Sequence, residues 1–410
     1  MQAVGNHENE ADPKDTNTGD PASMKILIST DCYLFNTGGI TASVLALCTG
    51  LRRLGHEVRT LSLSNCHKSF RDGDDYYIKS FPAFYYPGMR MSFAMRDPLL
   101  KELEAWDPDL IHIQTEGAPR SMALRIRKHC CSPIVMTCHT DYGHFVFGRC
   151  KSWLPVKKLM QTVGWILYRQ ADRVIAPSQK AAGFPFLYSV RDRITVVPNG
   201  MAAEKYQKHL PEEKRRAFRA SLGICARMRT LVTVSRLSKE KNVQELISFL
   251  PALIRKNPNI KLLIVGDGPY KKRLEGLTEK LQLSDSVIFT GMVPSEDVWR
   301  YYDAGDLFVS ASTFEVHSMS YLESLANGLP LLCRADDALA GVLDHGKNGM
   351  IYHSEKEFVD YTIRILADER IRKDMGRRSL LMAENYSSGT FASSVFSVYE
   401  DAIHENAKRK

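Results

Sequence analysis

Short apolar runs of strand length alternate along this chain with segments whose apolar residues recur at helical spacing. In the first half, the strand-like runs cover 24–30, 57–63, 110–113, 134–137 and 173–176, and helical patterns cover 41–54 and 122–128. Strands that alternate with helices are typical of a parallel sheet covered by helices on both faces. We therefore predict an α/β fold for this half.

The same alternation restarts after a charged stretch at 212–216. Further strand-like runs follow at 231–234, 261–266, 287–290 and 307–310. We expect two α/β domains of similar size with a boundary near residue 200. Residues 1–23 are polar, with almost no bulky apolar side chain, so we expect a disordered tail before a first domain at 24–200.

Composition narrows the class of protein. The 410 residues are 44% hydrophobic and 25% charged, which is typical of a soluble globular chain and too long for one small binding module. We see neither a membrane-spanning apolar run nor a signal peptide, and the nine cysteines lack any CxxC spacing, so a cytoplasmic protein is expected. The net charge is +8; because the first 23 residues contribute −4, the remainder carries +12. That excess favours an anionic partner, which is a phosphate-bearing donor, an anionic membrane or a nucleic acid.

Ligands of open α/β sheets bind beyond the carboxyl ends of the strands, so two such domains are expected to face one another across a cleft. The pair Gly38 and Gly39 follows the first strand and precedes a helix, where backbone amides favour a phosphate or a sugar hydroxyl; a plain turn is the alternative. Gly266 opens a Gly-Asp-Gly sequence with the same placement. Lys271 stands where a dinucleotide fingerprint needs a third glycine, so we do not expect NAD.

Two cations and two carboxylates also follow predicted strands. Arg236 and Lys241 are placed to neutralise a diphosphate, especially one that is leaving, although a solvated charged loop has the same pattern. Glu315 lies in a loop before a predicted helix at 320–327, and Glu323 lies along that helix. A carboxylate can accept hydrogen bonds from a ribose or sugar diol; two surface acids are the alternative.

His139 comes directly after a strand, where an imidazole can bond a sugar hydroxyl, although a lone histidine is more often structural. The two Asp-x-Asp matches, 72–74 and 107–109, lie at the wrong end of the fold for a metal in the cleft. We find no nucleophile elbow and no zinc-protease motif. No metal site is predicted.

The stretch 151–169 places apolar residues at helical spacing beside lysines. This is the pattern of an interfacial helix drawn to anionic lipid, with Trp153, Lys157 and Lys158 as candidate membrane contacts. A core-packing helix with a cationic outer face explains the pattern equally well.

The ordered set of motifs resembles glycosyltransferase family 4, retaining nucleotide-sugar enzymes of the GT-B fold. The resemblance runs from about Met24 to the end of the chain. Its motifs are Gly38-Gly39-Ile40, His139-Thr140, Val197-Pro198-Asn199-Gly200, Arg236 with Lys241, Gly266-Asp267-Gly268-Pro269, the two-glutamate motif and Gly346-Lys347-Asn348-Gly349. The segments 136–142 and 334–342 are most similar to the bacterial branch that includes diacylglycerol α-glucosyltransferases.

The resemblance implies a fold, and it implies a role for each domain and for several residues. It implies two Rossmann-like domains facing an interdomain cleft: an acceptor-binding domain at 24–200, a nucleotide-sugar-binding domain at 201–385, and a helix at 386–410 that crosses back to the first domain. It implies that Arg236 and Lys241 hold the donor diphosphate and that Glu323 holds the ribose. Glu315 and His139 would then hold the transferred sugar.

Gly38, Gly39, Gly266, Ser318, Met319 and Ser320 complete the donor site that the resemblance implies. It also implies retention of configuration by front-face attack and no metal or other cofactor. Two residues depart from the family pattern, Val316 and Ser318, where relatives commonly have glycines. These departures leave the donor preference open.

The expected activity is transfer of a hexose, from UDP-glucose, to a hydroxyl of diacylglycerol or a glycolipid at the inner face of the membrane. Alternatives are another donor (GDP-mannose, UDP-galactose or UDP-GlcNAc), a soluble acceptor, or a sugar-nucleotide epimerase of the same fold. A nucleic-acid-binding protein is a further class, but we find no basic run interleaved with aromatics, so no nucleic-acid partner is expected.

Overall fold

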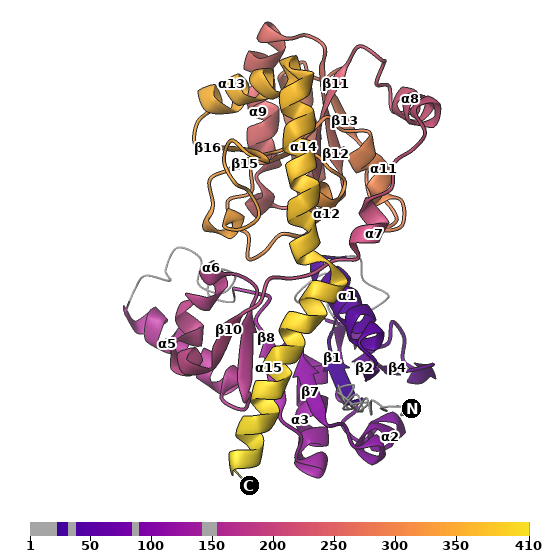
Figure 1. Cartoon of the computed structure of the whole chain (residues 1–410), viewed down its shortest axis with the longest axis vertical. Coiled ribbons are helices and arrows are strands. Elements are labelled where there is room, and N and C mark those ends of the chain that lie inside the picture. The colour runs from indigo at the N-terminus through magenta and orange to yellow at the C-terminus, as the bar shows by residue number, and fades with distance from the viewer. Residues whose placement is uncertain (1–22, 32–37, 84–89, 142–153, 410) are drawn as a thin grey trace, which may run out of the picture.

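The computed structural model describes residues 23–31, 38–83, 90–141 and 154–409. These residues form two α/β lobes stacked along the long axis of the molecule (Figure 1). Each lobe is built on its own sheet, and every strand pair is parallel except two short pairings in the first lobe. The α/β class and the GT-B architecture predicted from sequence are confirmed.

The sheet of the first lobe has the order β10-β9-β8-β7-β1-β2-β4-β3. Its strands are β1 (Lys25–Ser29), β2 (Glu57–Leu63), β3 (Phe70–Asp72), β4 (Asp75–Ile78), β7 (Leu110–Ile113), β8 (Ile134–Thr137), β9 (Arg173–Ala176) and β10 (Ile194–Val196). The helices around it are α1 (Gly39–Arg53), α2 (Pro98–Trp106), α3 (Ala118–Cys130), α5 (Leu154–Tyr168), α6 (Gln179–Ala182) and the 3₁₀ segment η2 (Pro185–Arg193). A small ribbon pairs β5 (Phe81–Pro82) with β6 (Arg90–Met91).

The sheet of the second lobe has the order β13-β12-β11-β14-β15-β16. Its strands are β11 (Arg229–Val234), β12 (Ile260–Val265), β13 (Val287–Phe289), β14 (Leu307–Ser310), β15 (Leu331–Arg334) and β16 (Gly349–Tyr352). Its helices are α7 (Ala203–Tyr206), α8 (Glu212–Ser221), α9 (Val243–Lys256), α10 (Lys271–Lys280), α11 (Val298–Asp303), α12 (Met319–Ala326), α13 (Glu355–Ala367) and α14 (Glu369–Ala383). Short 3₁₀ segments are η3 (Lys239–Lys241), η4 (Asp337–Leu339) and η5 (Glu384–Tyr386).

The strand order reverses once in each sheet, beside its first strand. In the first lobe β1 lies between β2 and β7, and in the second β11 lies between β12 and β14. The chain that leaves the carboxyl end of one central strand therefore turns to one side, and the chain that leaves its neighbour turns to the other. The crevice between them is where open α/β sheets bind ligands.

A long C-terminal helix, α15 (Ser388–Arg409), crosses back over the first lobe and packs along α1 (Figure 1). The chain passes between the lobes at two adjacent places, because the backbone N–H of Met201 donates to the carbonyl of Tyr386 at 2.8 Å. The returning helix is confirmed. The domain limits at 200 and 385 remain predictions.

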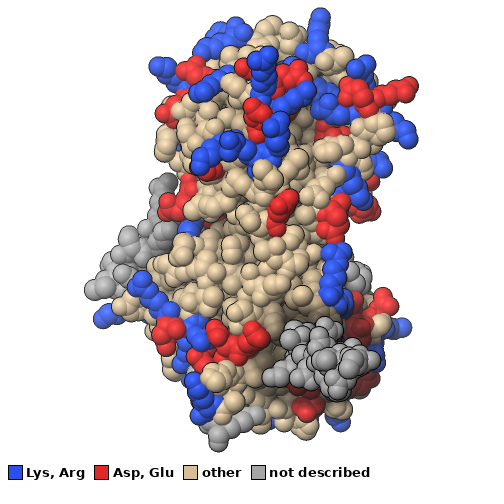
Figure 2. Space-filling model, viewed as in Figure 1, with Lys and Arg blue, Asp and Glu red and all other residues tan. Residues whose placement is uncertain are grey.

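Figure 2 shows side chains of both charges interspersed over this face of the upper lobe, with a largely uncharged band across the middle of the molecule. On this face the positive excess does not gather into one continuous stripe. The net charge of +12 on residues 24–410 therefore does not form, on this face, a continuous basic surface of the kind that binds a nucleic acid.

Close packing of α1 against α15 depends on Gly50. A Cβ at this position would lie 2.3 Å from the carbonyl oxygen of Ser388 and 2.5 Å from the Cβ of Ala392. We expect Gly50→Ala to lower the free energy of unfolding by about 2 kcal/mol, because the two helices must separate. Urea denaturation measures the change.

The matched control is Gly276→Ala, since Gly276 lies in α10 and a Cβ there would meet nothing within 4 Å. This variant should be neutral, or more stable by up to about 1 kcal/mol through helix propensity. Equal stability changes in the two variants would contradict the packing argument.

Candidate active site

The two predicted cations lie at the reversal point of the second sheet. Arg236 follows β11 and is exposed, and Lys241 ends η3 directly before α9. The Nζ atom of Lys241 lies 2.7 Å from Oε1 of Glu315, which arrives from the carboxyl end of β14. Glu315 is only 7% exposed, so its charge is compensated mainly by Lys241. The structure thus joins two predicted site residues from opposite sides of the crevice.

The carboxylate of the glutamate on α12 is held by two tyrosines from other segments of the chain. Oε1 of Glu323 accepts a hydrogen bond from Tyr206 at 2.8 Å, and Oε2 accepts one from Tyr302 at 2.7 Å. Burial raises the pKa of Glu323, and the two tyrosine hydroxyls and Lys205 offset this only in part. Each carboxylate oxygen keeps a further lone pair with which it can accept a diol hydroxyl.

The glycine loop of the first lobe lies against the start of α12. A Cβ at Gly39 would come within 3.1 Å of Cγ of Met319, whereas one at Gly38 would meet nothing within 4 Å. Ser318, which departs from the family glycine, has an ordinary extended backbone (φ −78°), and its Oγ lies 3.1 Å from Oγ of Ser320. A side chain at this position therefore imposes no backbone strain.

Gly266 is a glycine for a steric reason. It follows β12 with φ +131°, and a Cβ there would lie 2.0 Å from the carbonyl oxygen of Ser235. This contact brings the end of β12 against the residue that precedes Arg236. Gly266 shapes the crevice through its backbone.

His139 follows β8 at the corresponding edge of the first sheet. Its Nε2 donates to Oε1 of Gln114 at 2.8 Å, which leaves Nδ1 as an acceptor. Gln114 also contacts the buried His112, whose Nδ1 bonds the hydroxyl of Tyr399 on α15 at 2.7 Å. Burial and the nearby His317 lower the pKa of His139 to about 4, so the imidazole is neutral near pH 7.

Side chains of the first lobe hold the loop that carries Glu315. Ser178 Oγ donates to the carbonyl of Val316 at 2.7 Å, and the amide of Asn199 donates to the carbonyl of His317 at 3.5 Å. Lys180 on α6 forms a 2.7 Å ion pair with Asp336 of the second lobe. Val316, the second departure from the family pattern, also packs against the core of the first lobe.

These supporting residues carry little signal in the sequence. Asn199 lies in a motif that was recognised without a role, and Tyr206, Ser178 and Lys180 lie in segments with no local signal. Another missed residue is Asp31, a carboxylate one position beyond the first predicted strand.

The candidate membrane helix is only partly described. Trp153 and the side chain of Lys157 lie outside the described residues, and Lys158 is exposed on α5. Met160 and Tyr168 of α5 are buried, whereas Trp165 and Ile166 are 45% and 51% exposed. One face of α5 therefore packs into the first lobe and the other is exposed, and the membrane contact stays a prediction.

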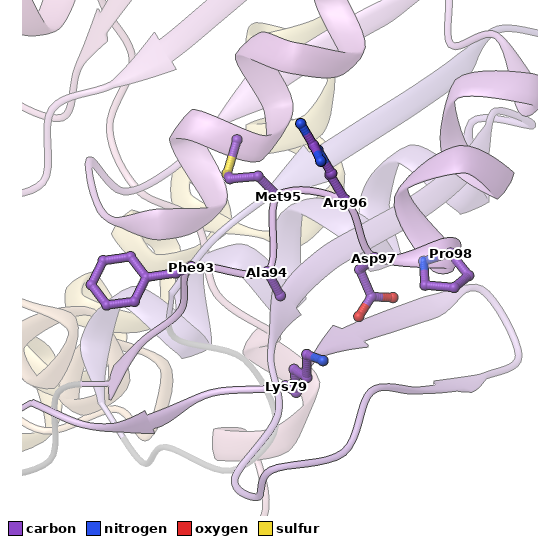
Figure 3. Close-up of a pocket in the computed structure, with 7 residues that line it drawn as sticks. All are labelled: Lys79, Phe93, Ala94, Met95, Arg96, Asp97 and Pro98. Atoms are coloured by element: carbon purple, nitrogen blue, oxygen red, sulfur yellow. The ribbon is translucent and has the colours of Figure 1, made fainter.

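A shallow hollow of about 370 Å³ lies elsewhere on the first lobe, where the chain from Phe93 to Pro98 passes Lys79 (Figure 3). None of the predicted site residues lines it. Within the described part of the chain, no cluster of His, Cys, Asp and Glu side chains is suited to a metal ion. No helix among the described residues is long and apolar enough to cross a membrane.

The tyrosine contacts to Glu323 lead to a prediction. Tyr302→Phe removes one hydrogen bond to a buried carboxylate, so the KM for a nucleotide-sugar should rise about tenfold with a smaller change in kcat. Tyr76→Phe is the matched control, because the buried hydroxyl of Tyr76 accepts a hydrogen bond from Arg59 at 3.1 Å on β4 of the other lobe. Donor titrations that respond equally to both variants would contradict a ribose-binding role for Glu323.

Comparisons with known proteins agree with this geometry. Residues 37–205 match the model of Glycosyltransferase Family 4, and residues 214–381 match that of Glycosyl transferases group 1. The chain is 29% identical over 390 residues to alpha-monoglucosyldiacylglycerol synthase of Streptococcus pneumoniae, covering 94% of this chain and 88% of the relative. It is 27% identical to the synthase of the same name from Acholeplasma laidlawii, covering 94% and 99%.

Solved structures show the same fold. HepE of Anabaena in complex with UDP-glucose superimposes with a TM-score of 0.69 at 18% identity, covering 92% of this chain and all of that one. Sucrose-phosphate synthase of Thermosynechococcus elongatus gives a TM-score of 0.71 at 20% identity, covering 93% and 99%. With two matched domains, the GT-B fold and paired charges at the crevice, the chain belongs to glycosyltransferase family 4.

Proposed function

We propose that this protein transfers glucose from UDP-glucose to the hydroxyl of diacylglycerol or a related glycolipid, with retention of configuration and without a metal. The Lys241–Glu315 pair at the reversal point of the second sheet carries the proposal. The names of its relatives support the acceptor class, and HepE, solved with UDP-glucose, supports a nucleotide-sugar donor.

The donor diphosphate would lie beside Arg236 and Lys241. Fixed positive charge in a crevice stabilises the negative charge that grows on a leaving diphosphate, which is the main task of a transferase that uses no metal. The ribose would hydrogen-bond to Glu323. Gly266 lets the backbone after β12 pack against Ser235, the residue before Arg236, because a Cβ at Gly266 would lie 2.0 Å from the carbonyl oxygen of Ser235.

The transferred sugar would lie between Glu315 and His139. When the diphosphate takes over part of the charge of Lys241, Glu315 becomes available to sugar hydroxyls. His139 is neutral and offers Nδ1 as an acceptor. The attacking hydroxyl would approach on the face from which the diphosphate leaves, and the leaving oxygen would take its proton.

A lipid acceptor requires contact with a membrane surface. The exposed side chains Leu159, Val163, Trp165 and Ile166 share α5 with Lys158, and the guanidinium of Arg169 lies 4.6 Å from the ring centroid of Trp165. Apolar side chains beside cations suit the interface of an anionic bilayer. We propose that α5 rests on the inner face of the membrane.

The diphosphate role predicts the effect of removing either cation. Arg236→Ala or Lys241→Ala should raise the activation barrier by about 2 to 4 kcal/mol, which is a loss of roughly 30- to 1,000-fold in kcat/KM. Lys256→Ala is the matched control, since Lys256 forms a 2.7 Å ion pair with Asp360 on the outer surface of the same lobe. Its rate should equal that of the wild type.

The measurement uses labelled UDP-glucose and diacylglycerol vesicles, with GDP-mannose, UDP-galactose and UDP-GlcNAc as parallel donors. The anomeric configuration of the product is read by NMR, and chelator is present in one arm. Wild-type turnover in Arg236→Ala would contradict the assigned role. Epimerised nucleotide-sugar without acceptor would indicate the epimerase instead.

The membrane role of α5 predicts a change in vesicle binding. Trp165→Ser combined with Ile166→Ser should weaken cosedimentation with phosphatidylglycerol-containing vesicles about tenfold, while donor binding stays unchanged. Leu381→Ser is the control, because Leu381 is a 60% exposed apolar residue on α14 of the other lobe. Equal vesicle binding by the wild type and the α5 variant would overturn the assignment.

A further inference from the structure

Asp31 lies at the reversal point of the first sheet, beyond the carboxyl end of β1. It follows β1 by two residues, and its backbone N–H donates to Oγ1 of Thr115, two residues beyond β7, at 2.7 Å. Strands β1 and β7 stay paired as far as Ser29 and Ile113, after which their chains turn to opposite sides. Asp31 thus has the place in the first lobe that Arg236 has in the second.

Only one oxygen of this carboxylate has a structural role. Oδ2 accepts a hydrogen bond from the backbone N–H of Gly117 at 3.1 Å, and Gly117 is the N-cap residue of α3, which has no side chain of its own for the purpose. Oδ1 is buried and has no hydrogen-bond partner among the described residues. An unpartnered buried carboxylate oxygen is unfavourable in a folded protein unless a ligand completes it.

Gly117 fixes the position of the Asp31 carboxylate. A Cβ at Gly117 would lie 2.2 Å from Oδ2 and 2.5 Å from Oδ1 of Asp31, so the carboxylate rests directly on the glycine. Burial raises the pKa of Asp31 to about 6, and the polar groups of Thr115 and Gly117 beside the carboxylate lower it only in part. The group is therefore ionised near pH 7.5 and protonated below pH 6.

We infer that Oδ1 of Asp31 accepts the hydrogen bond of the acceptor hydroxyl and that this carboxylate restricts the enzyme to uncharged alcohol acceptors. The inference rests on the proposed function, because it assigns the acceptor half of the same cleft. An anionic carboxylate binds a neutral O–H donor and repels a phosphate-bearing headgroup at the same place. A lipid whose headgroup is a bare hydroxyl fits this chemistry.

Charged groups on the neighbouring elements are engaged elsewhere. Glu116 accepts a hydrogen bond from Tyr168, and the guanidinium of Arg120 on α3 donates to the carbonyls of Ile166 and Leu167. His139, beyond β8, has a pKa of about 4. Of Asp31 and His139, which both follow strands of the first sheet, only Asp31 is expected to change its protonation state near pH 6.

The test is acceptor kinetics of Asp31→Asn at saturating donor. The asparagine retains an oxygen for Gly117 but loses the charge, so kcat/KM for diacylglycerol should fall 10- to 100-fold while the donor KM changes less than twofold. The wild type should lose acceptor kcat/KM about tenfold per pH unit below pH 6, and the variant should show no such limb. Turnover of phosphatidylinositol, relative to diacylglycerol, should rise in the variant.

The matched control is Asp97→Asn. Asp97 is also a buried capping carboxylate of the first lobe, at the start of α2 (Figure 3), but both of its oxygens have partners: Leu99 N–H at 3.1 Å and Ser69 Oγ at 2.6 Å. This control should keep the acceptor kinetics and the pH limb of the wild type. Equal acceptor kinetics in the two variants would overturn the inference.

Stability provides a readout that does not depend on substrate. A carboxyl whose pKa is raised on folding contributes stability below its unfolded pKa and loses it as the pH rises through 6. The melting temperature of Asp31→Asn, relative to that of the wild type, should therefore rise between pH 5 and pH 7.5. A variant that is less stable than the wild type by the same amount at every pH indicates a capping role alone and overturns the inference.

A panel of lipid acceptors distinguishes failure of the role assigned to Asp31 from failure of the proposed function. Wild-type transfer to phosphate-bearing lipids but not to diacylglycerol would overturn the role of Asp31 and leave a lipid glycosyltransferase. Transfer to no lipid at all would overturn the proposed function as well.

Discussion

The Lys241–Glu315 ion pair is the constraint on which the cleft depends. Glu315 is nearly buried, and a buried carboxylate without a partner is costly, so the loop after β14 must stay within reach of the segment after β11. These two strands are the ones between which the sheet reverses direction. The 2.7 Å Lys241–Glu315 contact joins these two segments, together with the 2.9 Å hydrogen bond from Thr313 N–H to the carbonyl of Glu240. In the proposed reaction a diphosphate competes for Lys241, so donor binding and the release of Glu315 toward the sugar become one event.

The loop that carries Glu315 is shared between the lobes. Ser178 and Asn199 of the first lobe bind the carbonyls of Val316 and His317, and the Lys180–Asp336 pair closes the same side. Relative movement of the lobes must therefore displace the loop that carries Glu315. His139 is supported in a similar way, since Gln114 and His112 connect it to Tyr399 on the returning helix. The C-terminal helix thus reaches the site through side chains as well as through packing.

Sequence patterns predicted the bounds of several central strands accurately, because parallel strands are buried on both faces and therefore form continuous apolar runs. The runs at 57–63, 110–113, 134–137 and 307–310 coincide with β2, β7, β8 and β14, and the helix expected at 320–327 is α12, after which Gly328 takes φ +75°. Period and turn chemistry are local properties, so one chain is enough to see them. The polar strand β3 was missed because Phe70–Asp72 carries no apolar alternation.

Only part of the candidate site could be predicted from the sequence, because many of its contacts join segments that are far apart along the chain. Residues that follow strands, such as Arg236, Glu315 and His139, could be named because the fold places strand ends at the cleft. Tyr206 and Tyr302 reach Glu323 from distant segments, and no spacing along the chain encodes those contacts.

The sequence alone does not distinguish Asp31 from Asp97. Both are aspartates whose carboxylates accept a backbone N–H at the start of a helix in the same lobe. At Asp97 a serine hydroxyl and a backbone N–H use both oxygens, and the carboxylate is complete as folded. At Asp31 the second oxygen is buried without a partner, and the same residue type carries a raised pKa. Capping alone needs one acceptor, which a serine would supply without burying a charge. The excess charge at Asp31 is therefore better explained by something that enters the crevice than by the helix beneath it.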